Sequence, residues 1–153
     1  MPHFILMKDK ELPEADALKL RARLHIRAFW TLMRHGRHAQ GIITLYDGFE
    51  SAVRSYSIRH KLQVPTEFRE WGTRVYKYLA RSGFVTNDIH IESFENLMTR
   101  ALEPDFDEMN PDFDFQKLWR DMEKVFRELE IVPFDFKSLP AENEVTRRAM
   151  GIE

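Results

Sequence analysis

The chain has 153 residues and a formal net charge of −2, from 23 lysines and arginines against 25 aspartates and glutamates. Hydrophobic residues make up 43% and charged residues 31%, which excludes a disordered chain and predicts one globular domain over residues 1–153. The charge excludes a global field that attracts nucleic acid or anionic lipid, and the lack of cysteine excludes disulfides and thiolate chemistry. No apolar run approaches the length of a membrane span, so we expect a cytoplasmic protein that does not contact membranes.

Helical periodicity begins after residues 1–12, which we expect to form a loose N-terminal arm. Pro13 suits the first turn of a helix, and the acidic residues after it suit the positive end of the helix dipole. A first helix is predicted from Glu14 to His35, with Gly36 ending it. Its apolar residues recur at helical spacing: Leu20, Leu24, Ala28 and Leu32.

The stretch from Gly36 to Lys61 contains a second predicted helix, which begins at about Arg37 and lies at the centre of the fold. Gly41 and Gly48 cost a helix roughly 1 kcal/mol each relative to alanine, so we expect a neighbouring helix to approach closely there. The apolar residues of this helix form a seam that faces one partner surface. The residues of the seam are Ile42, Tyr46, Phe49, Val53 and Tyr56.

Two more helices are predicted in the middle of the chain. Val64-Pro65-Thr66 breaks the helical pattern and opens the third helix, which Gly83 ends. The fourth helix runs from about Asp88 to Leu102. We expect the apolar face of the third helix to consist of Phe68, Trp71, Val75, Tyr78 and Leu79.

An acidic loop over residues 105–114 then leads to a fifth helix from Phe115 to Glu130. Residues 133–153 predict a peripheral tail with one short helix between Pro140 and Met150. No segment alternates with the period of two that a sheet requires. The sequence therefore predicts an all-α, up-and-down helical bundle of about four main helices, with a further helix and a C-terminal tail.

Arg54, Tyr56 and His60, at the end of the second helix, are the candidates for catalysis. Histidine can carry a proton from a ribose hydroxyl and arginine can hold a scissile phosphate, the chemistry of metal-independent RNA cleavage. On one ideal helix Arg54 and His60 lie about 120° apart in azimuth and about 9 Å apart along the axis. A structural alternative is that Glu50 and Arg54 form an ordinary ion pair and that His60 extends the apolar seam.

The run from Gly36 to Ala52, GRHAQGIITLYDGFESA, resembles a helix of HEPN-type bundles. In that family a small residue after a first helix leads to a turn, a tyrosine and an apolar stripe that contains alanine. Its ribonuclease members carry an arginine, a polar residue, a few variable residues and a histidine, and Arg54-Ser55 with His60 fits this pattern. The resemblance covers roughly residues 14–62. It implies an all-α bundle that associates as a homodimer and acts in RNA or nucleotide metabolism.

Two pairs of carboxylates suggest a different enzyme. Glu67 with Glu70 and Glu92 with Glu95 have the spacing that places both acids of a pair on one face of a helix. Two such faces opposed bind Mg²⁺ and a nucleoside triphosphate. This spacing resembles that of all-α nucleotide pyrophosphohydrolases of the MazG type, although Glu95 lacks the glycine-aspartate context of that family.

Basic residues crowd the first helix and the turn after it, and the best cluster for binding phosphate is Arg27, Arg34 and His38. The alternative is a solvated helix paired with the acids of the 105–114 loop.

No motif predicts a metal ligand set or a cofactor. We therefore expect a helical binding or interaction module that forms a homodimer and has RNA, a nucleotide or another protein as its partner. The alternatives are a metal-independent ribonuclease and a Mg²⁺-dependent pyrophosphohydrolase.

Overall fold

The fold, in a computed structural model that describes residues 12–142 and 144–149, confirms the all-α helical bundle. No strand occurs within these residues, and none of their helices has the length and apolar character needed to cross a lipid bilayer. Two short 3₁₀ turns, η2 (Thr66–Phe68) and η3 (Phe136–Ser138), interrupt the connections. The α-helices are α1 (Glu14–Arg34), α2 (His38–Arg59), α3 (Gly72–Arg81), α4 (His90–Ala101), α5 (Phe106–Met109), α6 (Phe115–Glu128) and α7 (Glu144–Ala149).

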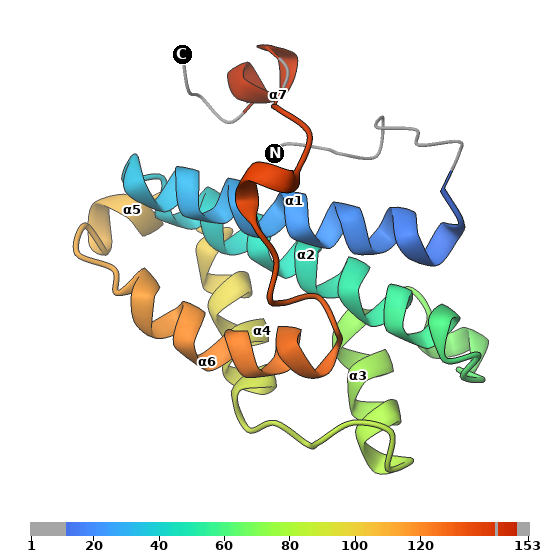
Figure 1. The fold of residues 1–153 in the computed structure, drawn as a ribbon. Helices are drawn as coiled ribbons and strands as arrows, with labels where there is room; N and C mark the ends of the chain where they lie inside the picture. Colours follow the sequence, from blue (N-terminus) through green and yellow to red (C-terminus); the bar gives the residue numbers. More distant parts are fainter. Residues whose placement is uncertain (1–11, 143, 150–153) are drawn as a thin grey trace.

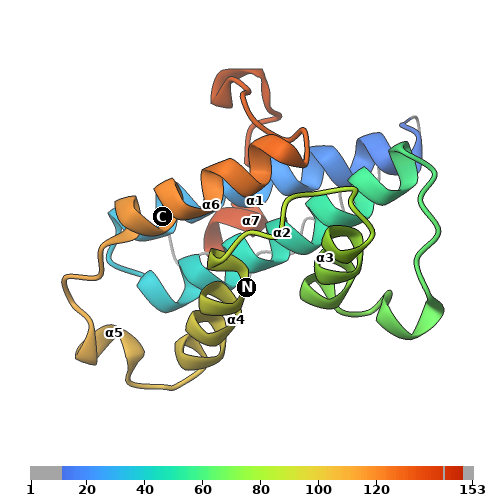
Figure 2. The same ribbon diagram turned by 90° about the horizontal axis from the view of Figure 1, so that it is seen from below.

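Helices α1 and α2 lie side by side in opposite directions, and α6 runs alongside them (Figure 1). Helices α3 and α4 cross this layer and appear foreshortened when the molecule is viewed from below (Figure 2). Helix α5 lies at the end of the bundle where α1 leads into α2, and η2 lies at the opposite end. Helix α2 contacts α1, α3, α4, α5 and α6, as expected for the central helix.

The seam predicted for α2 is buried from Ile42 to Val53, while Tyr56 at its end is half-buried. Its rings interlock with those of the crossing helices, since the ring of Tyr46 lies 5.5 Å from that of Phe94 and the ring of Phe49 lies 5.7 Å from that of Tyr76. Aromatic pairs at such distances stabilise a core by about 0.5–1.5 kcal/mol beyond the burial of their area. These contacts fix α3 and α4 against α2.

Helix α1 buries two different faces. Ala22, Ile26, Phe29 and Met33 belong to the main core. The stripe that the sequence singles out, from Leu20 to Leu32, lies in a smaller separate cluster that includes Leu139 from the C-terminal segment. Two faces are buried because α2 packs on one side of α1 and the C-terminal segment crosses the other (Figure 1).

The third helix begins later than predicted, at Gly72 instead of directly after Pro65. Its first residues form η2 and a loop, and the carboxylate of Glu50 in α2 accepts a hydrogen bond from the backbone N–H of Gly72 at 3.3 Å. Trp71 consequently lies outside the helix and is 54% exposed, whereas Tyr76 is completely buried. The late start of α3 and the exposure of Trp71 accompany a contact with another helix, and the local sequence does not reveal this contact.

The predictions for the C-terminal part of the chain agree with the structure in one helix and differ slightly in another. Helix α7 lies within the short C-terminal helix predicted between residues 140 and 150. Helix α6 ends at Glu128, two residues early, because Glu130 adopts a left-handed backbone with φ of 64°. The predicted N-terminal arm falls outside the described residues except for Leu12.

Helix α1 packs against both glycines of α2, but the atoms that it places beside them differ in how easily they can move. A methyl group on Gly48 would lie 2.9 Å from Cβ of His25 and 3.4 Å from the backbone oxygen of Ala22, whereas one on Gly41 would meet the flexible end of Met33. We expect Gly48→Ala to destabilise the protein by about 1–3 kcal/mol, because the helices must move apart. Gly41→Ala, the matched control, should be neutral or stabilising by up to about 1 kcal/mol. Urea denaturation measures both, and an equal effect of the two substitutions would contradict the close approach.

Candidate functional site

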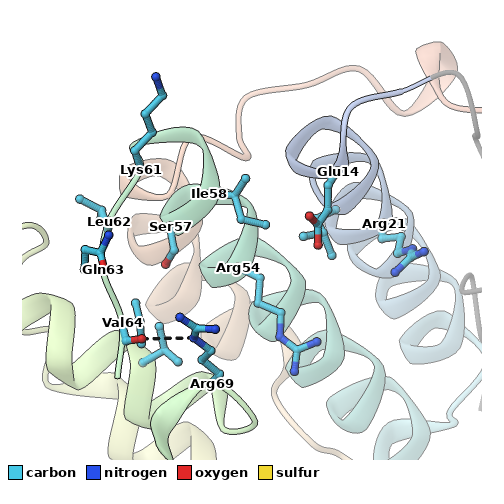
Figure 3. Close-up of a pocket in the computed structure, with 12 residues that line it drawn as sticks. Glu14, Arg21, Arg54, Ser57, Ile58, Lys61, Leu62, Gln63, Val64 and Arg69 are labelled. Carbon is cyan, nitrogen blue, oxygen red and sulfur yellow. Dashed lines mark hydrogen bonds between the residues drawn. The ribbon is translucent and has the colours of Figure 1, made fainter. Parts of the chain in front are cut away.

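An open groove of about 670 Å³ lies where the first turns of α1 face the end of α2 and the segment that follows it (Figure 3). Among the described residues, four cationic side chains line the groove, and Glu14 is the one acidic residue that does so. The cationic residues are Arg21, Arg54, Lys61 and Arg69. The remaining lining is aliphatic or uncharged: Leu18, Ser57, Ile58, Leu62, Gln63, Val64 and Val75. We call this site the cationic groove.

Helical spacing forms two walls of the cationic groove. Glu14, Leu18 and Arg21 follow one another at steps of four and three on one face of α1. Arg54 and Ile58 occupy the facing side of α2, one turn apart. The hydroxyl of Ser55 donates a hydrogen bond of 2.7 Å to the backbone oxygen of Ala15, which ties α2 to the first turn of α1 beside the groove.

Arg69 closes the third side, and its Nε donates to the backbone oxygen of Val64 at 3.2 Å (Figure 3). Arg54 and Arg69 approach the same space from α2 and from the loop after η2, with Arg21 opposite them on α1, whereas Lys61 points away from the others. Three arginines from three segments thus surround one volume, and Lys61 stands at its rim.

The charge of the cationic groove is largely uncompensated. None of its four cations forms an ion pair within 4 Å among the described residues. Nε of Arg21 is shielded from solvent and lacks a hydrogen-bond partner in that part of the chain. Arg54, Lys61 and Arg69 are exposed. Such a surface favours an anionic ligand that offers several oxygen acceptors.

The structure brings two of the three predicted catalytic residues together and leaves the third apart. The ring of Tyr56 lies 4.3 Å from that of His60, and the hydroxyl of Tyr56 donates to the backbone oxygen of Phe84 at 3.3 Å. His60 is hydrogen-bonded through Nε2 to Oε1 of Glu130 at 2.6 Å. Arg54 lines the cationic groove, which neither Tyr56 nor His60 does.

Arg59 is the arginine that does accompany His60, because its Nη1 lies 3.3 Å from the same Oε1 of Glu130. Neither Arg59 nor Glu130 is among the site residues predicted from the sequence. The carboxylate comes from the residue that follows the C-cap of α6, seventy residues beyond His60, so no local pattern connects them. Arg21 and Arg69 were also missed, although the helical spacing on α1 gave a usable signal for Arg21.

The expected ion pair between Glu50 and Arg54 does not form within 4 Å. Glu50 instead turns toward Gly72. Burial raises the pKa of the Glu50 carboxyl, and the Gly72 hydrogen bond and the charge of Arg54 oppose this shift. The guanidinium of Arg54 therefore lines the groove without an ion pair to Glu50.

The predicted phosphate-binding residues occupy three separate environments. Arg27 binds the C-terminal segment, because its Nη2 donates to the backbone oxygen of Pro140 at 2.7 Å and its Nε lies 3.5 Å from Glu142. His38 is buried, with Nδ1 3.2 Å from the backbone oxygen of Asn110. Only Arg34 is exposed. These residues therefore do not form the wall of a common cleft.

The carboxylate pairs are also placed differently from the expectation. Glu67 lies in η2 and Glu70 in the loop before α3, so these two acids do not share the face of an α-helix. Within the described residues no group of three or more histidine, aspartate or glutamate side chains is arranged to hold a metal ion.

No protein-family model matches the chain, and no curated protein or solved structure is significantly similar to it.

The pair of His60 and Glu130 makes stability depend on pH. The hydrogen bond from His60 lowers the pKa of the Glu130 carboxyl below its ordinary value, and the charges of Arg59 and Lys19 act in the same direction. A carboxyl whose pKa is lower in the folded state stabilises the fold above its unfolded pKa, and this contribution disappears as the pH falls through the folded value.

We therefore expect Glu130→Gln to be less stable than the wild type at neutral pH, with the difference shrinking below about pH 4. Thermal unfolding followed by circular dichroism between neutral and acidic pH measures this. Glu70→Gln, at an exposed carboxylate without an ion pair within 4 Å among the described residues, serves as the control. A difference that stays constant with pH would contradict the pairing.

Proposed function

We propose that this protein is a cytoplasmic helical binding module that holds a phosphate-bearing ligand, RNA or a nucleotide, in the cationic groove. The observation that carries the proposal is that Arg21, Arg54 and Arg69, from three segments, line one open groove. Glu14 is the one carboxylate among the described residues of its lining. A guanidinium donates paired hydrogen bonds to phosphate oxygens, so three of them favour a ligand with more than one phosphate oxygen exposed.

The size and the lining of the groove support a ligand of this kind. Its volume of about 670 Å³ lies inside the range of roughly 300–1,000 Å³ that is usual for small-molecule sites. The aliphatic residues between the cations give the uncharged part of a nucleotide an apolar surface. Because the net charge of the chain is −2, an attraction to RNA has to come from a local patch such as this one. The resemblance to HEPN-type bundles, which includes Arg54, favours the same ligand class.

Arg54→Gln removes one exposed guanidinium from the cationic groove and should weaken binding of a short single-stranded RNA about tenfold. The slope of log affinity against log salt should also fall by about 1, because one phosphate contact is lost. Fluorescence anisotropy with labelled RNA, and with labelled ATP, measures both quantities.

Arg34→Gln is the matched control, since Arg34 is equally exposed, carries the same charge and lies at the far end of α1. It should leave affinity nearly unchanged. Equal losses in the two variants, or no binding by the wild type at low salt, would contradict the proposal.

A metal-independent ribonuclease is the second candidate, and the contact of His60 with Glu130 favours it. A carboxylate that accepts a hydrogen bond from one ring nitrogen orients a histidine and leaves its other nitrogen for proton transfer. Arg59 and Tyr56 lie beside this pair. Arg59 thus takes the phosphate-holding role for which the sequence suggested Arg54.

This second candidate predicts that RNA cleavage persists in EDTA and is lost in His60→Ala. His35→Ala is the control, because His35 is also exposed and hydrogen-bonds only to the backbone of its own helix, at Thr31, among the described contacts. Cleavage of a labelled RNA on a gel, with circular dichroism to verify the fold, gives the result. Unchanged cleavage in His60→Ala, or dependence on Mg²⁺, would exclude this candidate.

A further inference from the structure

The corner between α4 and α6 combines exposed apolar and acidic side chains. Leu102 is 62% exposed and Met109 is 72% exposed. Four exposed carboxylates accompany them: Glu103, Asp105, Glu108 and Asp112. We call residues 102–112 the acidic corner.

The acidic corner is anchored by its backbone and by two of its side chains. Asp107 accepts a hydrogen bond of 2.8 Å from the N–H of Ala39, and the side chain of Asn110 donates to the backbone oxygen of Phe106 at 2.9 Å. Phe106 is buried in the main core. The exposed residues are therefore presented on a defined turn.

The exposed carboxylates of the acidic corner have no cationic partner in the described part of the chain. None of the four lies within 4 Å of a lysine, arginine or histidine nitrogen there. The cationic groove shows the reverse condition, since none of its four cations has a carboxylate within 4 Å among the described residues. Opposite charges that are both unpaired and exposed attract one another between molecules, over distances set by the salt concentration.

The apolar parts of the two surfaces also correspond. Ile58 in the cationic groove is 41% exposed and is surrounded by aliphatic residues. Among the residues that the structure describes, none of the side chains that line the groove is aromatic. A leucine or methionine flanked by carboxylates matches an aliphatic surface flanked by arginines.

We propose that the acidic corner of one copy docks into the cationic groove of a second copy. The two surfaces lie at opposite ends of the α1–α2 pair (Figure 1), so a chain does not fill its own groove. A two-fold axis that relates two antiparallel copies pairs both corners with both grooves at once. This inference uses the same groove as the proposed function but does not require its phosphate ligand, which competes with the corner for Arg54.

Charge reversal on each surface tests the pairing. Arg54→Glu and Glu108→Arg should each weaken self-association of the full chain at least roughly tenfold, because each places like charges opposite one another. An equimolar mixture of the two variants should associate again, since each altered surface then meets an opposite charge. Sedimentation velocity over a concentration series, at low and high salt, measures the association.

Arg34→Glu is the control for a change of net charge and should associate like the wild type. Circular dichroism verifies that each variant is folded. A wild type that stays monomeric at every concentration, or variants that fail alone and also fail when mixed, would overturn the inference. If the protein binds RNA but stays monomeric, the proposed function stands and the self-association is contradicted. If it associates in a salt-sensitive way but does not bind RNA, the self-association stands and the proposed function is contradicted.

Discussion

The close contact between α1 and α2 at Gly48 determines where the other elements lie. The missing side chain lets α2 approach His25 of α1 so closely that a methyl group has no room. The two long helices therefore stay adjacent over their length, and the hydrogen bond from Ser55 to Ala15 continues the contact to the end of the pair. Both helical walls of the cationic groove depend on this arrangement, because one belongs to each helix.

Aromatic contacts then attach the shorter helices to this pair from two sides. Trp30 of α1 meets Trp119 of α6 at 5.8 Å, and Trp119 stacks on Phe126 of its own helix. On the other side Phe49 of α2 meets Phe94 of α4 at 6.1 Å. These aromatic rings pack against one another within the bundle, whereas the described residues that line the cationic groove are aliphatic, polar or charged. A rigid aromatic frame holds a polar site at its edge, where long side chains can adapt to a ligand.

The sequence predicted best the features that residues close together in the chain determine, such as the ends of the long helices. Helices α1 and α2 were placed to within one or two residues because Pro13, Gly36 and the apolar spacing act locally. The start of α3 was missed because the carboxylate of Glu50, from another helix, bonds to its first N–H. Arg54 was identified from its motif, but its surroundings were not, since Arg21 and Arg69 approach it only in the folded chain. The partner of His60 was hidden for the same reason.

The net charge of −2 does not indicate that exposed positive and negative side chains lie at different ends of the fold. Within the described part of the chain, cations without an ion pair gather at one end of the α1–α2 pair and carboxylates without an ion pair at the other. In the proposals above, a phosphate ligand and the acidic corner of a second copy therefore compete for the same guanidinium of Arg54. Thermodynamic linkage makes such competition reciprocal. The factor by which the bound ligand lowers the self-association constant equals the factor by which self-association lowers the affinity for the ligand. The concentration of the ligand would then set the oligomeric state, and the concentration of the protein would set the apparent affinity for the ligand.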